Sequence, residues 1–355
     1  MLTILKKYNL TLVLFPILLF LLGVITIHSI TPERTNNQLL FFSIGAAIYI
    51  ILASIDYTVL KYYWWVPYIS VVGLLILTFI IGKAVGGSVR WITIGPMALQ
   101  ASEFAKVALV ISTSAIISKV AKKAQVTIKN AVYTIVISMP MVVLIITQPD
   151  LGTTLALIFI LVGLLYFAGL NRKIFILGSL LIILAANPLW NSLHDYQKNR
   201  ILVFLNPQLD TKGAGYNVVQ SIIAVGSGGL SGQGFGRGTQ SHLQFLPAYW
   251  TDFIFASYAE EWGFIGVVLL ILLCIGLHFS LLFMAANIKD TFGVLLIIGA
   301  FLMFFIQFVI NVGMNIGLMP VTGIPLPFVS YGGSSLIASC MLLGIAQSVW
   351  VYRNV

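Results

Sequence analysis

The chain has 355 residues, of which 59% are hydrophobic and only 8% are charged. Average soluble proteins are about 45–50% apolar and about 25% charged. The few charges of this chain cannot cover the surface of a soluble fold of its size. The same composition excludes disordered, collagen-like and disulfide-stapled proteins. Roughly 210 apolar residues are enough for about ten membrane spans of ~20 residues each, so we predict an all-α polytopic integral membrane protein.

Ten apolar runs follow one another along the chain, and we expect each to form one transmembrane helix. They lie at about 10–30, 38–55, 62–82, 102–118, 131–147, 151–169, 174–190, 253–286, 293–312 and 331–350. The first run is too long for a signal peptide and has no small-x-small cleavage site, which predicts an uncleaved span. Cys274 and Cys340 lie inside apolar runs without a CxxC or metal-ligand spacing, which indicates buried membrane residues.

The charges around these runs predict the topology. With the N-terminus in the cytoplasm, eleven basic residues fall on the inner side, and Asp56 and Asp290 are the acids there. The basic residues are Lys6, Lys7, Lys61, Lys119, Lys122, Lys123, Lys129, Arg172, Lys173, Lys289 and Arg353. The other basic and acidic residues balance one another, so the net charge of +9 lies inside. This pattern predicts that both termini are cytoplasmic, and it explains the positive charge without nucleic acid.

The segment 191–251, between the seventh and eighth runs, is the one sizeable extramembrane segment, and we expect it on the extracytoplasmic side. Within it, Gly215–Val225 and Phe245–Pro247 are apolar enough to lie in the membrane interface. Its stretch 226–238, GSGGLSGQGFGRG, follows no predicted strand and lacks the Lys-Ser/Thr of a P-loop. We expect a flexible or tightly turned loop against a ligand there rather than a nucleotide cradle.

Ionisable groups at membrane depth are costly, and each is therefore a candidate for function. Glu103 and Lys106 stand three residues apart on a predicted helix, so their side chains are neighbours. They form either a self-neutralising structural pair or a carboxylate and a cation that line a polar cavity. In the second case Arg90 and Trp91 lie at the rim of that cavity. Ser102 also fits the N-cap position of this helix.

Two further acids stand at predicted helix starts. Asp150 opens the sixth run after Pro149, in a tight hairpin, and N-capping is its structural explanation. Asp252 precedes the run 253–286, which would extend about 50 Å against an apolar core of ~30 Å, so its first turns must rise above the outer boundary or tilt. Asp252 then lies near the outer face, where the helix dipole favours an anion. Capping by Thr251 or Asp252 is the alternative.

The segment 317–335, GLMPVTGIPLPFVSYGGSS, carries three prolines and several glycines in apolar surroundings and includes Ser330. Such a composition indicates non-helical backbone, which is tolerated beside a bilayer where it is buried or lines a watery cavity. Gly332, Gly333 and Ser334 open the last run and can present N–H groups and a helix N-terminus to an anion such as phosphate. An ordinary re-entrant turn is the alternative.

Five motifs occur in order along almost the whole chain: G-x-x-R-W-I, S-E-F-A-K, Q-P-D-L-G-T, T-D-F-I-F and P-V-T-G-I-P-L-P-F-V-S-Y-G-G-S-S. Each motif is weak alone, but the set resembles the SEDS family of bacterial cell-wall proteins. The Leu of Q-P-D-L-G-T and the stretch Asn311–Pro320 favour its RodA branch over its FtsW branch. The resemblance implies one SEDS-type membrane domain over residues 1–355.

The resemblance implies a peptidoglycan glycosyltransferase in the cytoplasmic membrane of a bacterium. It would polymerise lipid II into glycan strands at the outer face during cell-wall elongation, with a class B penicillin-binding protein and other elongation proteins as partners. The catalytic aspartate falls on Asp252, and the substrate-binding residues are expected at Arg90, Trp91, Glu103, Lys106, Asp150, Arg200, Ser330, Gly333 and Ser334. The sequence departs from the family in two places: Ala248-Tyr249-Trp250 lacks the usual Glu and His, and Ala101 replaces a Pro.

The chemistry of such a transfer fits these residue types. The acceptor hydroxyl loses a proton as it attacks the anomeric carbon, and Asp252 is the best-placed general base. The leaving undecaprenyl pyrophosphate needs cations or helix N-termini, for which Arg90, Lys106 and Arg200 are candidates, and Gly333 and Ser334 weaker ones. In-line displacement inverts the anomeric centre. A divalent cation, Mg or Mn, is left open, although no carboxylates have metal-ligand spacing. A lipid II flippase and a non-catalytic scaffold are the alternative functions.

Overall fold

The computed structural model describes residues 7–85, 88–94, 97–120, 126–192, 195–210 and 213–353. The residues outside these ranges include Lys6, Lys122, Lys123 and Gly87, the first residue of the G-x-x-R-W-I motif. The longer helices are α2 (Thr11–Ile30), α3 (Pro32–Ser54), α5 (Trp65–Ile81), α6 (Ala101–Val120), α7 (Ile128–Thr147), α8 (Leu151–Phe167), α9 (Arg172–Leu184), α11 (Asp195–Leu205), α12 (Ala214–Ser227), α14 (Ile254–Ala286), α15 (Thr291–Asn315) and α16 (Gly333–Val351). The shorter ones are α4 (Thr58–Tyr62), α10 (Ala186–Ser192), the 3-10 turn η1 (Pro207–Leu209) and α13 (Thr239–His242).

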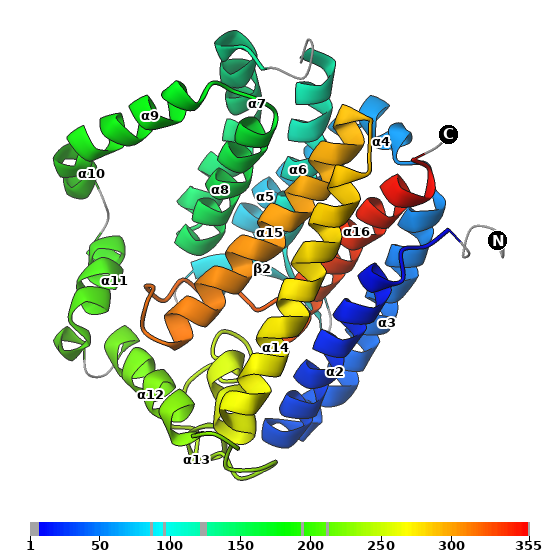
Figure 1. Cartoon of the computed structure of the whole chain (residues 1–355). Helices are drawn as coiled ribbons and strands as arrows, with labels where there is room; N and C mark the ends of the chain where they lie inside the picture. The colour runs from blue at the N-terminus through cyan, green and yellow to red at the C-terminus, as the bar shows by residue number, and fades with distance from the viewer. Residues whose placement is uncertain are drawn as a thin grey trace.

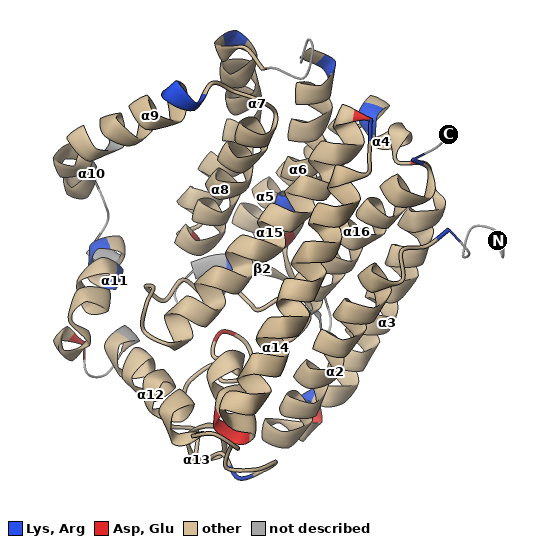
Figure 2. Cartoon of the chain, viewed as in Figure 1, with Lys and Arg blue, Asp and Glu red and all other residues tan. Residues whose placement is uncertain are grey.

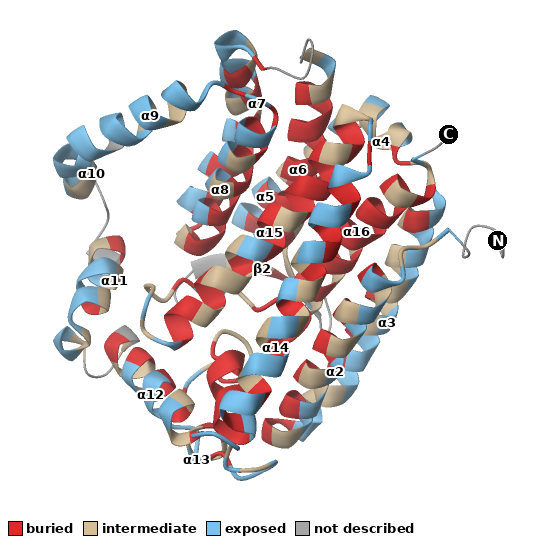
Figure 3. Ribbon diagram, viewed as in Figure 1, coloured by how far each residue is buried: buried red, intermediate tan, exposed pale blue. Residues whose placement is uncertain are grey.

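Helix α6 lies at the centre of the bundle, in contact with α5, α7, α8, α15 and α16 (Figure 1). It is buried along almost its whole length, whereas α9 and the outer faces of α2, α3 and α14 are exposed (Figure 3). Small residues such as Ala105, Ala108 and Ala115 on α6 are fully buried, and small side chains allow neighbouring membrane helices to approach closely. Large apolar side chains such as Ile183 and Leu184 are exposed instead, as expected of a surface that faces lipid.

The all-α polytopic membrane fold is confirmed. Within the described ranges, seven helices are long and apolar enough to cross a membrane, namely α2, α3, α6, α7, α14, α15 and α16, and α5 and α8 are shorter apolar helices. The predicted seventh run, 174–190, does not form one helix, because the chain leaves helical hydrogen bonding at Ala185 and continues as α10. The total of ten spans therefore stays a prediction.

The basic residues of the described segments gather where the topology expects them. Lys and Arg lie at the starts of α7 and α9, at α4 and near the C-terminus (Figure 2). These places contain Lys61, Lys129, Arg172 and Lys173. The charge distribution predicts that all of these connections between helices are cytoplasmic. The orientation with both termini inside stays a prediction that this arrangement favours.

Three short strands, which the sequence analysis did not predict, interrupt the helical fold. They are β1 (Lys83–Val85), β2 (Ser88–Ile94) and β3 (Met97–Gln100), and they pair antiparallel in the order β1-β2-β3. In β2, Val89, Trp91, Ile92 and Thr93 are residue types that favour strands. The pairing sets Trp91 opposite Gln100, immediately before α6 begins. The hairpin thereby fixes the Arg90 and Trp91 segment beside the start of the central helix.

Helix α14 is not the single straight helix that the sequence predicted. It is kinked at Gly263, where φ is 63° and ψ is −165°, a conformation that favours glycine. A kink frees backbone hydrogen-bonding groups, and the Gly-rich loop (226–238) binds them. The Phe264 amide donates to a carbonyl of that loop at 2.9 Å, and the Gly234 amide donates to the Glu261 carbonyl at 3.0 Å. The Gly-rich loop is thus tightly turned, as one of the two predicted alternatives, and it packs against a helix, while its contact with a ligand stays a prediction.

The two glutamates that precede the kink anchor the outer loop (191–251). Glu260 is fully buried, and its carboxylate accepts hydrogen bonds from the Gln240 and Ser241 amides at the start of α13. Glu261 is also buried and lies 3.3 Å from His242 Nε2. Much of the outer loop is helical, as α11, α12 and α13, so the chain leads into α14 along a fixed path. The same path fixes the position of Asp252, which follows the loop directly.

Candidate active site

A cavity of about 330 Å³ lies where β2, α11, the turn before α14 and the start of α16 converge. Its lining residues come from five separate parts of the sequence: Arg90, Trp91, Gln100, Arg200, Thr251, Asp252, Val321, Thr322, Gly323, Pro325, Tyr331, Gly332, Ser334 and Ser335. Five of the predicted site residues line it, namely Arg90, Trp91, Arg200, Asp252 and Ser334. Asp150 lies behind one wall. Glu103, Lys106, Ser330 and Gly333 are not among the lining residues.

The backbone around Asp252 is held by two asparagines of α15. The Asp252 carbonyl accepts hydrogen bonds from Asn311 Nδ2 at 3.0 Å and from Asn315 Nδ2 at 3.1 Å. Asn311 also donates to the Ile324 carbonyl at 2.8 Å, so it ties the turn to the non-helical segment that forms the opposite wall. Both asparagines are fully buried. The position of the half-buried Asp252 carboxylate is therefore set by packing and does not depend on a mobile loop.

The capping explanation for Asp252 is wrong. The N-cap of α14 is Phe253, without a side-chain hydrogen bond, and the Ala256 amide in the first turn is satisfied by Asn315 Oδ1 at 3.1 Å. The Thr251 hydroxyl donates to the Ala248 carbonyl instead of capping the helix. The Asp252 carboxylate is thus left in the cavity wall rather than consumed at the helix start.

Desolvation raises the pKa of Asp252 to about 6. The negative charge of Asp150 also raises this pKa, whereas the positive charges of Arg200 and Arg90 lower it. The carboxyl group is therefore poised close to neutral pH, the range in which a side chain both accepts and releases a proton readily. Among the residues that line the cavity, Asp252 is the only carboxylate.

Arg90 is bound to the turn between α7 and α8. Its Nε donates to the Gln148 carbonyl at 3.0 Å, a terminal nitrogen donates to the Pro149 carbonyl, and the other lies 4.0 Å from Asp150 Oδ1. Asp150 in turn caps α8, accepting from the Thr153 amide at 3.1 Å, as predicted. Asp150 thus positions Arg90 from behind the cavity wall. The second cation, Arg200, reaches the cavity from α11.

The start of α16 faces the cavity, since Gly332, Ser334 and Ser335 line it and the helix begins at Gly333. No side chain caps this helix, so the positive end of its dipole is directed at the cavity. The Ser334 hydroxyl accepts from the Gln100 amide at 2.9 Å, which joins α16 to β3. Gly333 packs against Phe41, and an added Cβ would lie 3.0 Å from that ring.

Ser330 and Ser102 hold the walls together. The Ser330 hydroxyl donates to the Thr251 carbonyl at 2.8 Å and accepts from the Leu326 amide, and it is buried. Ser102 lies inside α6, which begins at Ala101, so the prediction that it is the N-cap is wrong. Its hydroxyl is 3.3 Å from Asp150 Oδ2 instead. These contacts make both serines positioning residues, and direct substrate binding by Ser330 stays a prediction.

Glu103 and Lys106 form a buried ion pair on α6. Lys106 Nζ lies 2.8 Å from Glu103 Oε1, and the side chains are 1% and 2% exposed. Glu103 Oε2 has no hydrogen-bond partner among the described residues. The geometry favours the structural-pair interpretation over a substrate contact, since neither residue lines the cavity.

Removing one member of this pair is expected to cost more than removing both. Lys106→Met leaves a buried carboxylate without its cation and should destabilise the protein by about 3–5 kcal/mol, whereas Glu103→Gln/Lys106→Met should recover much of that loss. Thermal unfolding and polymerisation of lipid II, measured on the same preparations, check this. A double variant that unfolds like the wild type yet makes no glycan would instead indicate that Lys106 binds the substrate.

Tyr331, Thr322 and Ser335 line the cavity but were not singled out as site residues from the sequence. All three lie in or beside the segment 317–335, whose composition predicted a cavity wall without indicating which side chains face inwards. Among the described residues, no group of three or more His, Cys, Asp or Glu side chains comes together. The lining of the cavity thus holds one carboxylate that could contact a metal ion, that of Asp252, and a role for Mg or Mn stays open.

Residues 8–355 match the profile of the FtsW/RodA/SpoVE family, described as cell cycle protein. The chain is 37% identical over 325 residues to Peptidoglycan glycosyltransferase MrdB of Escherichia coli (strain K12), covering 91% of this chain and 86% of that protein. It is 31% identical over 396 residues to Peptidoglycan glycosyltransferase RodA of Treponema pallidum (strain Nichols), covering 91% and 90%.

The fold is similar to that of one chain in a solved structure of a peptidoglycan synthase complex. That structure is described as showing the structural coordination of polymerization and crosslinking by the complex. The TM-score is 0.84 and the sequence identity 27%, with 98% of each chain covered. Sequence and fold therefore agree over nearly the whole length. This chain belongs to the FtsW/RodA/SpoVE family, the family that its five motifs predicted.

Proposed function

We propose that this protein is a peptidoglycan glycosyltransferase of the bacterial cytoplasmic membrane, which polymerises lipid II into glycan strands during cell-wall elongation. The observation that carries the proposal is the cavity, in which one carboxylate of raised pKa lies with two guanidinium groups and the start of a helix. Relatives that match more than nine-tenths of the chain are named for this activity.

Asp252 acts as the general base of this reaction. The hydroxyl of the acceptor sugar attacks the anomeric carbon of a second lipid-linked sugar, and its proton passes to the Asp252 carboxylate. The bond from the anomeric carbon to the pyrophosphate oxygen breaks as the new glycosidic bond forms. Attack opposite to the leaving group inverts the anomeric centre and gives a β-linkage from an α-linked donor.

Arg90, Arg200 and the start of α16 stabilise the leaving pyrophosphate, on which negative charge grows in the transition state. Arg90 suits this role because its contacts to Gln148, Pro149 and Asp150 fix the guanidinium before substrate arrives. Preorganised groups of this kind need no rearrangement as the charge develops. Trp91 stands beside Arg90 on β2 and shapes the same wall.

A flippase would use the same polar cavity for transport, and a scaffold would use the fold only to recruit a class B penicillin-binding protein. The relatives favour catalysis, since those that match more than nine-tenths of the chain are named for glycosyl transfer and not for transport. We also propose such a transpeptidase as partner, because a chain of similar fold belongs to a complex that couples polymerization and crosslinking.

Purified protein in detergent, supplied with lipid II and no other protein, tests the proposed function. A glycosyltransferase is expected to produce glycan strands that gel electrophoresis resolves as a ladder. Intact lipid II after prolonged incubation, under conditions in which the protein stays folded, would instead favour the flippase or the scaffold.

A further inference from the structure

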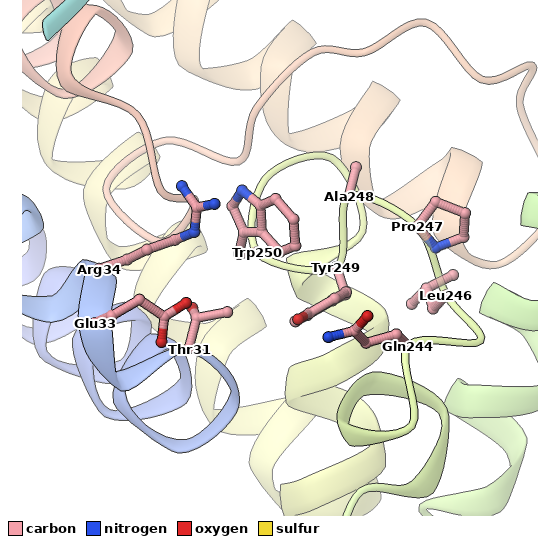
Figure 4. Close-up of a pocket in the computed structure, with 9 residues that line it drawn as sticks. All are labelled: Thr31, Glu33, Arg34, Gln244, Leu246, Pro247, Ala248, Tyr249 and Trp250. Carbon is pink, nitrogen blue, oxygen red and sulfur yellow. The ribbon is translucent and has the colours of Figure 1, made fainter. Parts of the chain in front are cut away.

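Trp250 forms one wall of a second pocket, which has a volume of about 380 Å³ (Figure 4). Its lining residues come from the start of α3 and from the end of the outer loop: Thr31, Glu33, Arg34, Gln244, Leu246, Pro247, Ala248, Tyr249 and Trp250. The wall is shared with the active site, because Trp250 directly precedes Thr251 and Asp252. The Tyr331 amide also donates to the Trp250 carbonyl at 2.9 Å. The end of the outer loop and the residue that follows it thus contribute to both cavities.

Aromatic rings hold the cation of the pocket in place. The Arg34 guanidinium lies over the Trp250 ring (Figure 4), 4.3 Å from its centre, and 5.3 Å from the centre of the Tyr331 ring. These cation–π contacts fix its direction but use none of its N–H donors. Arg34 Nε is buried and has no hydrogen-bond partner among the described residues. The guanidinium is thus oriented by the two rings at the edge of the pocket, and one of its N–H donors is used by no described residue.

The pocket also carries an acid that does not neutralise this cation. Glu33 is exposed, and no ion pair within 4.0 Å joins it to Arg34 in the described part of the chain. Gln244 and Ala248, at two turns of the pocket wall, have φ angles of 58° and 49°, which non-glycine residues rarely adopt. Such conformations cluster where a loop is shaped to hold a ligand. The pocket therefore offers one anionic and one cationic group on a fixed frame.

We propose that this pocket binds the stem peptide of the lipid-linked substrate, with Arg34 contacting a peptide carboxylate. The inference rests on the proposed function. The other parts of that substrate fit the pocket less well: its lipid is apolar, its sugars are uncharged, and its pyrophosphate is assigned to Arg90, Arg200 and the start of α16 in the other cavity. The peptide carries both carboxylates and an amino group, which match Arg34 and Glu33. Such charge-assisted hydrogen bonds are strong and specific for geometry.

Binding of two probes to the purified full-length protein in lipid nanodiscs tests the proposal. One probe is lipid II with its complete pentapeptide. The other is the same lipid-linked disaccharide without the peptide, in which the lactyl carboxyl group is capped as a methylamide. The wild type is expected to bind the first more tightly. Arg34→Gln should weaken binding of the complete probe about 10-fold or more and leave the capped probe unchanged, since it removes a hydrogen bond to a charged group.

Two variants control for charge and folding. Arg237→Gln removes an exposed arginine of the Gly-rich loop, outside the pocket, and should leave binding of both probes unchanged. Arg34→Lys keeps the charge over Trp250 and should retain part of the preference. Equal binding of the two probes by the wild type, or an equal loss of both in Arg34→Gln, would overturn the proposal. So would an Arg34→Gln defect that is seen only when a transpeptidase partner is present.

Polymerisation measured on the same samples separates this inference from the proposed function. A protein that polymerises both probes without preference lacks the peptide subsite but is still a glycosyltransferase. A protein that prefers the complete probe yet makes no glycan has the subsite but not the activity.

Discussion

Asp252→Asn is expected to reduce polymerisation of lipid II by about 10²–10⁴-fold, the usual contribution of general acid–base catalysis. The substituted side chain has nearly the same size but cannot accept the proton of the attacking hydroxyl. Folding should be preserved, because α14 is not capped by Asp252 and the Asn311 and Asn315 contacts go to its backbone carbonyl. Lipid II binding should also survive, since the cations of the cavity are untouched. Glycan gels, thermal unfolding and lipid II binding measure the three expectations.

Asp210→Asn is the matched control. Asp210 lies in the outer loop, binds the Gly213 amide at 2.9 Å and does not line the cavity, so the same change of charge there should leave polymerisation close to the wild-type rate. Near-normal polymerisation by Asp252→Asn would remove this residue from the mechanism. The base would then have to be sought at Asp150 or Glu103.

Arg90→Lys should lower kcat by about 10²–10³-fold, the cost of losing one preorganised group that stabilises transition-state charge. Lysine keeps the positive charge but has no planar fork, so it cannot contact the Gln148 and Pro149 carbonyls and Asp150 together. The ammonium is therefore no longer fixed at the pyrophosphate. Initial rates over a range of lipid II concentrations separate kcat from KM.

Arg237→Lys serves as the comparison, because it makes the same substitution in an exposed arginine outside the cavity. A purely structural role for Arg90 predicts instead that the fraction of folded protein falls in Arg90→Lys. The value of kcat per folded molecule would then be unchanged once the active fraction is titrated.

Much of the fold follows from local patterns in the sequence. Eight of the ten predicted runs correspond to single unbroken helices, because an apolar stretch in a membrane must satisfy its backbone internally. The cap formed by Asp150 and the pairing of Glu103 with Lys106 were also predictable from local sequence, because each joins two residues that are three positions apart.

Features that depend on distant segments were not predictable. The kink at Gly263 is possible only because the Gly-rich loop binds the freed backbone groups, and a sequence pattern does not show which segment will do so. The short hairpin around Arg90 is similar, because strand pairing is decided by register and by packing against neighbours. The motifs predicted which residues matter, whereas the convergence of five segments on one cavity needed the structure.

The departure at Ala248-Tyr249-Trp250 also has a place in the structure. These residues line the second pocket rather than the Asp252 cavity, and Trp250 is the ring over which Arg34 lies. The absent Glu and His therefore leave the proposed base, the cations and the start of α16 in place. The substitution changes the surroundings of the proposed peptide subsite and not the atoms that react.

The pH dependence of kcat for glycan polymerisation, with purified wild type and Asp252→Asn compared, tests the central claim most directly. A general base works only when deprotonated, so the wild-type rate should be low in acid, rise as the pH passes the Asp252 pKa of about 6, and level off above it. The residual rate of Asp252→Asn should show no such rise. A wild-type rate that is flat through this range, or the same acid limb in both proteins, would contradict the assignment of Asp252 as the base.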